Sequence, residues 1–180
     1  LFALLNIDLV LARFFLTFED AQTYIVISLL GKGLFLLSQF GSSKITALFS
    51  DQKQSKSYLY RLIFFTFLFN WIGFVVFGLE GAQTIPALFG QKFATSIPYL
   101  SFYFFGLVCF AIADRLMTFH LAKKNFTFII VSLAIMLLQI PLIVLHHENI
   151  GDFVRTFAYI GSTNLMLLII LQMNAMYNRI

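Results

Sequence analysis

The sequence has 180 residues, of which 60% are hydrophobic and only 11% are charged, and its net charge is +4. An average soluble domain is about 25% charged, so this composition excludes an ordinary soluble protein and indicates an integral membrane protein. The basic residues lie in short links beside long apolar runs, where they determine membrane orientation. We therefore expect no nucleic-acid binding.

Six apolar segments are long enough to cross a membrane if the first begins before Leu1. They are far longer than the roughly 10 residues of a barrel strand and do not alternate in polarity, which predicts helices. The expected spans are residues 1–18, 21–40, 58–79, 97–119, 126–145 and 153–173. The chain begins inside an apolar run without a signal sequence, so we expect a fragment of an all-α, polytopic membrane protein.

Two prolines are expected to shape the spans and their links. Pro141 lies inside the fifth span and predicts a kink, because proline leaves a backbone carbonyl without its donor. The longest link, residues 80–96, contains the apolar patch IPALF. It predicts a short interfacial helix with Pro86 near its start.

Two charged residues lie inside the first two apolar runs, which we expect to fold back on each other at residues 17–22. Asp8 lies ten residues before Phe18, and Lys32 lies eleven residues after Ala21. At about 1.5 Å per residue both are then about 15 Å deep, near the midplane of a hydrocarbon core about 30 Å thick. A charge there costs roughly 2.5 kcal/mol or more unless it is paired or lines a water-filled cavity. Asp8 and Lys32 are therefore expected to form a structural ion pair or to line a cavity.

Two further features bear on this pair. Lys32 is flanked by Gly31 and Gly33, which allow close helix contact or a local bend, but the GxxxxGK spacing of a phosphate loop is absent. A partly desolvated lysine suits a phosphate or another anion. Arg13 lies nearer the membrane surface, where it either extends to the interface or faces the same cavity.

Lysine and arginine in the short links predict the orientation. One side carries Lys44, Lys53, Lys56, Arg61, Lys123, Lys124 and Arg179, whereas the other carries Arg13, Lys92 and Arg155. The richer side is expected to be cytoplasmic, and both ends of the chain then lie on it.

Asp114 and Arg115 lie near the cytoplasmic end of the fourth span. There they either reach the interface or form a charged gate at a cavity mouth. Residues 146–152 contain two adjacent histidines and two acids, the only cluster that resembles metal ligands. Adjacent histidines do not share a helix face, and HExxH spacing is absent. We expect no metal and no cofactor.

Several stretches in succession carry a resemblance to a known family. They are NIDLVLARFFLTFEDAQTYIVISLLGKGLFLLSQF, the basic link KITALFSDQKQSKSYLYR, and PALFGQKFATSIPYL leading into a helix that ends DRLMTFHLAKKNF. This order resembles the C-terminal half of the polysaccharide-biosynthesis flippases of the multidrug/oligosaccharidyl-lipid/polysaccharide exporter superfamily. The shared features are an acid in the first helix, Tyr24 after the first turn, LFG before the fourth helix and a basic loop after it.

The resemblance implies that residues 1–180 are the second six-helix lobe of a two-lobed flippase in a bacterial inner membrane, with the N-terminal lobe missing. Such proteins move lipid-linked oligosaccharides by alternating access, so no enzyme activity is expected. Asp8, Arg13 and Lys32 would then contact a lipid diphosphate or a coupling ion. Two alternatives stay open. One is a drug/cation antiporter of the same superfamily, in which Asp8 should dominate. The other is a non-transporting membrane subunit that anchors a glycan-assembly complex.

Overall fold

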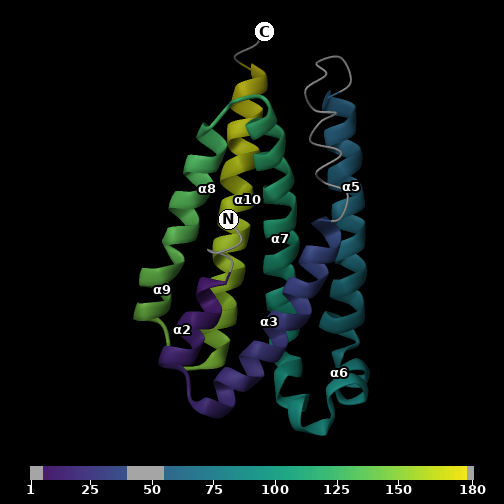
Figure 1. Cartoon of the computed structure of the whole chain (residues 1–180), viewed down its shortest axis with the longest axis vertical. Helices are drawn as coiled ribbons and strands as arrows, with labels where there is room; N and C mark the ends of the chain where they lie inside the picture. Colours follow the sequence, from purple (N-terminus) through teal and green to yellow (C-terminus); the bar gives the residue numbers. More distant parts are fainter. Residues whose placement is uncertain (1–5, 40–54, 178–180) are drawn as a thin grey trace.

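A computed structural model describes residues 6–39 and 55–177 of the chain (Figure 1). Every secondary-structure element in these ranges is a helix, which confirms the predicted all-α class. The α-helices are α2 (Ile7–Phe15), α3 (Phe18–Gln39), α5 (Ser55–Gly73), α6 (Gly81–Phe89), α7 (Ile97–Ala122), α8 (Thr127–Leu137), α9 (Gln139–Leu145) and α10 (Ile150–Tyr177). A π-helix, η1 (Phe74–Leu79), continues α5, and a 3-10 helix, η2 (Gln91–Ser96), precedes α7.

Five helical segments in the described ranges are long and apolar enough to cross a membrane. They are α3, α5 with η1, η2 with α7, α8 with α9, and α10. This arrangement is consistent with a multi-pass membrane protein. The expected sixth span is not confirmed, because the described part of residues 1–18 contains only the nine-residue helix α2. That helix rises about 14 Å, less than half of a hydrocarbon core.

The turn between α2 and α3 is shorter than the expected loop at residues 17–22. Only Leu16 and Thr17 separate the two helices. The Thr17 hydroxyl oxygen accepts a hydrogen bond from the Asp20 backbone N–H at 3.3 Å and donates one to the Asp20 carboxylate at 2.9 Å. Because this exchange satisfies a free N–H at the helix start, residues 19–22 belong to α3 rather than to a loop.

The two prolines affect their helices differently. The fifth span is broken between α8 and α9, and the last residue of α8, Leu137, lies four residues before Pro141. Pro141 has no N–H to donate to that carbonyl, which agrees with the interruption of the helix, while a kink at this point stays a prediction. The link at 80–96 does form a short helix, α6, followed by η2. Pro86, however, is the sixth of the nine residues of α6, so its expected place near the start is wrong.

Helix α7 is the central element of the bundle and packs against α3, α5 and α10. It has more buried residues than any other helix in the described ranges, as expected of a helix that packs against several others. The α2–α3 turn, α6 and the α9–α10 link lie at one end of the bundle, which we call the hairpin end (Figure 1). The α7–α8 link lies at the opposite end. The basic link after α3 falls largely outside the described residues.

The closest approach of α7 to α10 depends on two glycines. A Cβ atom on Gly106 would lie 2.9 Å from the Cα of Ala158, and one on Gly161 would lie 2.7 Å from the carbonyl oxygen of Gly106. Both distances are too short for a real contact, and the atoms in the way belong to backbone. Small residues thus set the spacing of these two helices, as is common between membrane helices.

We expect Gly106→Ala to destabilise the bundle, because α10 must move to admit the methyl group. Overpacking of this kind costs about 1–3 kcal/mol. The midpoint temperature of unfolding in detergent should therefore fall by several degrees. Gly33→Ala is the matched control, because a Cβ on Gly33 meets nothing within 4 Å. Equal stability of the two variants would contradict the proposed role of the α7–α10 contact.

Candidate functional site: a buried ion pair beside an arginine pocket

An ion pair joins α2 to α3 inside the bundle. The Lys32 Nζ lies 2.7 Å from the Asp8 Oδ1, and the Tyr24 hydroxyl donates a hydrogen bond to the Asp8 Oδ2, also at 2.7 Å. Asp8 is 0% exposed and Lys32 is 7% exposed. The prediction that the two charges lie at one level is confirmed by this contact. Both carboxylate oxygens therefore have a hydrogen-bond partner. The opposite charges of Asp8 and Lys32 offset each other within the pair.

Aromatic side chains surround the ion pair and tie it to the rest of the bundle. Tyr24 packs edge-on against Tyr103 of α7 and Phe153 of α10, with ring centroids 5.9 and 5.7 Å apart. The Tyr103 hydroxyl donates a hydrogen bond to the Ser28 Oγ at 2.9 Å, and its ring stacks on Phe157 at 4.5 Å. Helix α3, which carries Lys32, is therefore linked to both α7 and α10.

The two glycines beside Lys32 have unequal roles. The space where a Cβ of Gly31 would lie is taken by two side chains of α7, because Leu107 Cδ1 lies closest to that position and Tyr103 Cε1 lies 2.7 Å from it. Gly31 therefore allows α7 to approach α3 at the level of the ion pair, as the sequence predicted. Gly33 faces open space within this chain. The close-contact prediction thus holds for one glycine of the GKG triplet.

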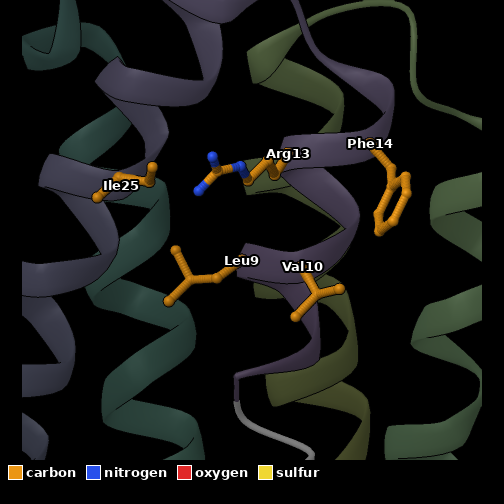
Figure 2. Close-up of a pocket in the computed structure, with 5 residues that line it drawn as sticks. All are labelled: Leu9, Val10, Arg13, Phe14 and Ile25. Carbon is orange, nitrogen blue, oxygen red and sulfur yellow. The ribbon is translucent and has the colours of Figure 1, made fainter.

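Arg13 is exposed and lines a cavity of about 560 Å³. Figure 2 shows its guanidinium extending from α2 toward α3, where Ile25 lies. The other lining residues are Leu9, Val10 and Phe14, so the walls around this cation are apolar. No ion pair within 4 Å joins Arg13 to an acidic side chain in the described part of the chain. The site offers an unpaired fork of hydrogen-bond donors in an apolar setting.

The structure thus brings the three candidate residues of the first two helices into one region, with different environments. Asp8 and Lys32 neutralise each other in the interior, whereas Arg13 lies about one helical turn further along α2, at the surface of the chain. From its sequence context, Lys32 is the expected anion ligand. Geometrically, Arg13 is the cation that a bound anion can reach without breaking an existing contact.

Arg115 is fully buried, and in the described part of the chain it is held by neutral groups rather than by an acid. Its Nε donates to the Thr66 Oγ1 at 3.0 Å, and its Nη2 donates to the Ser38 carbonyl at 2.6 Å. Its Nη1 has no hydrogen-bond partner among the described residues. Asp114 is half-buried and forms no ion pair with Arg115 within 4 Å in the described ranges. Arg115 thus joins α7 to α3 and α5, and the gate role stays a prediction.

The described residues contain no group of three His, Cys, Asp or Glu side chains that could hold a metal ion. In the link 146–149, His147 Nδ1 lies 2.8 Å from the Val144 carbonyl oxygen. Close by, the Asn149 side-chain amide donates to the Asp152 carboxylate at 2.9 Å. These contacts are local and organise the start of α10.

Tyr24 is the participant that residue-by-residue reasoning did not place in the site. Its sequence signal is helical spacing: Tyr24, Ser28 and Lys32 recur every four residues, so they share one face of α3. A buried tyrosine also needs a hydrogen-bond partner, and Asp8 is the acid within reach. The spacing could have predicted a polar stripe on α3, but not which groups face it.

Comparison of the chain with protein-family models, with curated proteins and with solved structures finds no match. The relation to flippases therefore stays a prediction from the order of sequence features.

We expect the Asp8–Lys32 pair to behave as one unit in stability measurements. Asp8→Leu or Lys32→Met alone leaves a buried charge without its partner, which costs about 3–5 kcal/mol. The double variant leaves no such charge and should be more stable than either single variant. Denaturant titration of the four proteins in detergent gives the coupling free energy. Additive effects of the two substitutions would refute the pairing.

Proposed function

We propose that this chain is one lobe of a bacterial inner-membrane flippase that moves lipid-linked oligosaccharide or polysaccharide precursors by alternating access. The observation that carries the proposal is Arg13, a cation without an acidic partner among the described residues, in a largely apolar cavity between helices of a multi-pass membrane protein. The family resemblance supplies the two-lobed architecture, with a second lobe as the partner of this one. No covalent chemistry on the substrate is involved.

The cavity beside Arg13 matches the chemistry of such a substrate. A lipid-linked glycan presents a phosphate group between a hydrocarbon chain and a sugar. A guanidinium binds phosphate through two parallel N–H donors, and an apolar setting strengthens these charge-assisted hydrogen bonds. Leu9, Val10, Phe14 and Ile25 provide apolar surface for the adjoining hydrocarbon chain. Arg13 is therefore assigned to the phosphate.

In this proposal the Asp8–Lys32 pair lies inside the bundle and supports the substrate site. It fixes α2 against α3 and so orients Arg13, which lies on the same short helix as Asp8. Proton transfer to Asp8 would remove the negative charge that holds Lys32. Lys32 would then be available as a second anion ligand, and Asp8 would be the coupling residue.

Arg115 is suited to stabilising a closed state during the proposed alternating-access movement. Its bonds to Thr66 and to the Ser38 carbonyl close the contact between α7, α3 and α5. Alternating access requires one end of a lobe to separate while the other stays closed. We assign Arg115 to stabilising one of the two closed states through these bonds. In the other state, the neighbouring Asp114 would replace Thr66 and the Ser38 carbonyl as the partner of Arg115.

The buried ion pair favours a second candidate, a non-transporting membrane subunit that anchors a glycan-assembly complex. A pair with both charges satisfied needs no ligand to account for it. The drug/cation antiporter is less well supported. It needs an acid that a cation can reach, whereas Asp8 is fully buried and holds two partners.

We expect Arg13→Gln to lower the initial rate of translocation by about tenfold or more, because a lost charge-assisted hydrogen bond costs about 1.5–3 kcal/mol. The assay follows a fluorescent polyprenyl-diphosphate-linked sugar in proteoliposomes that contain the full-length protein. Arg13→Lys should retain part of the rate, since it keeps the charge but loses the fork of donors. Arg155→Gln is the control, because Arg155 is exposed and lies outside this cavity.

The outcomes separate the candidates. Equal rates for the Arg13→Gln and Arg155→Gln variants would rule out a substrate role for Arg13. Wild-type protein that translocates no lipid-linked sugar, yet is required for assembly of a glycan complex in cells, would favour the anchoring subunit. Uptake of an organic cation that is lost in Asp8→Asn but kept in Arg13→Gln would favour the antiporter.

A further inference from the structure

A second cavity, of about 340 Å³, lies at the hairpin end of the bundle. The first turns of α3 contribute Phe18, Glu19, Gln22 and Thr23 to its lining, and η2 contributes Lys92, Phe93 and Thr95. Its volume falls within the range of small-molecule sites. Unlike the cavity beside Arg13, it is lined by charged, amide and hydroxyl groups as well as by aromatic rings.

Glu19 and Lys92 both line this cavity without neutralising each other. Both are exposed, and no ion pair within 4 Å joins them in the described ranges. Thr23 donates its hydroxyl to the backbone carbonyl of Glu19 at 3.0 Å, so that bond leaves the Glu19 carboxylate unoccupied. The Lys92 Nζ lies 6.0 Å from the centroid of the Phe93 ring. One cavity therefore presents an anion and a cation, each available to a ligand.

The position of the cavity points to a lipid. Helix α3 begins at Phe18, and its start lies at the hairpin end, where a spanning helix meets the headgroup layer (Figure 1). Phe18 is 77% exposed at the rim of the cavity. Ile25 and Leu29 follow at helical spacing and are also exposed. A polar cavity thus opens onto an apolar surface that runs along α3 into the membrane.

We propose that this cavity binds the headgroup of a phospholipid that carries both a primary ammonium and a phosphate, as in phosphatidylethanolamine. The ammonium donates to the Glu19 carboxylate and to the Thr95 hydroxyl oxygen. Lys92 and the Gln22 amide N–H groups donate to the phosphate. The acyl chains lie along Phe18 and the exposed face of α3. This assignment holds whether or not the chain transports a glycan.

The charges distinguish this headgroup from the common alternatives. A phosphatidylglycerol headgroup satisfies Lys92 but carries a neutral glycerol in place of the ammonium, so the Glu19 carboxylate is left without a counter-charge. A phosphatidylcholine headgroup has the same net charge as phosphatidylethanolamine, but its quaternary ammonium has no N–H to donate. Charge-assisted hydrogen bonds are about twice as strong as neutral ones, so the primary ammonium should be preferred over the quaternary one.

The test is native mass spectrometry of the full chain in detergent, titrated with phosphatidylethanolamine, phosphatidylcholine and phosphatidylglycerol of identical acyl chains. Wild-type protein should retain one phosphatidylethanolamine with an apparent Kd about tenfold or more below those of the other two lipids. Glu19→Gln and Lys92→Gln should each remove most of this preference. Glu80→Gln and Arg155→Gln are the controls, since both residues are exposed and lie outside the cavity.

Several results would overturn the assignment. Tighter binding of phosphatidylglycerol would leave Glu19 without a function in the site. Equal binding of phosphatidylcholine would refute the ammonium hydrogen bonds. Equal weakening by the control substitutions would show general charge dependence rather than a site. Displacement of the lipid by an equal concentration of water-soluble glycerophosphoethanolamine would refute the acyl contribution. Because these measurements need no translocation, they separate this inference from the proposed flippase activity.

Discussion

The Asp8–Lys32 contact is the interaction on which the rest of the structure depends. Two charges inside an apolar bundle are tolerated only when they face each other and when their remaining hydrogen-bonding capacity is satisfied. Tyr24 occupies the second carboxylate oxygen, and Tyr24 in turn is held between Tyr103 and Phe153. Gly31 leaves room for Tyr103 at this level. One fully paired carboxylate thus links contacts from α2, α3, α7 and α10.

The charges of the described bundle fall into distinct classes, and the difference is what makes some of them functional candidates. The Asp8–Lys32 pair is neutral and enclosed. Arg115 is enclosed but bonded to neutral oxygens, so it links three helices while keeping its positive charge. Arg13 is exposed and unpaired among apolar residues. Of these three arrangements, the last offers a cation to an incoming ligand without first breaking a contact, which is why the proposed phosphate site is placed there.

Helix α3 contributes to both the cavity beside Arg13 and the polar cavity at the hairpin end. Ile25 lines the cavity beside Arg13, and the first two turns of the same helix line the polar cavity at the hairpin end. Helix α3 is held in place inside the bundle by the Asp8–Lys32 ion pair and by the Tyr103–Ser28 hydrogen bond. A movement of α3 relative to α2 would therefore change both cavities together. A lipid headgroup seated against Glu19 and Lys92 would stabilise the present position of α3.

Composition and hydropathy by themselves determined the helical membrane class and five of the long apolar segments. The break at Pro141 could be predicted from the chemistry of the proline backbone. The common level of Asp8 and Lys32 could be predicted because the rise per residue of a helix is fixed. Hydropathy alone did not place the α2–α3 turn correctly, because the Thr17 cap extends α3 by local hydrogen bonds that hydropathy does not register. Only the tertiary structure decided that Lys32 is already paired while Arg13 is not, that Tyr24 completes the site, and that Glu19 and Lys92 share one cavity. The physical reason is that pairing depends on which faces of separate helices meet. In this bundle, the packing of α7 against α3 and α10 sets those faces.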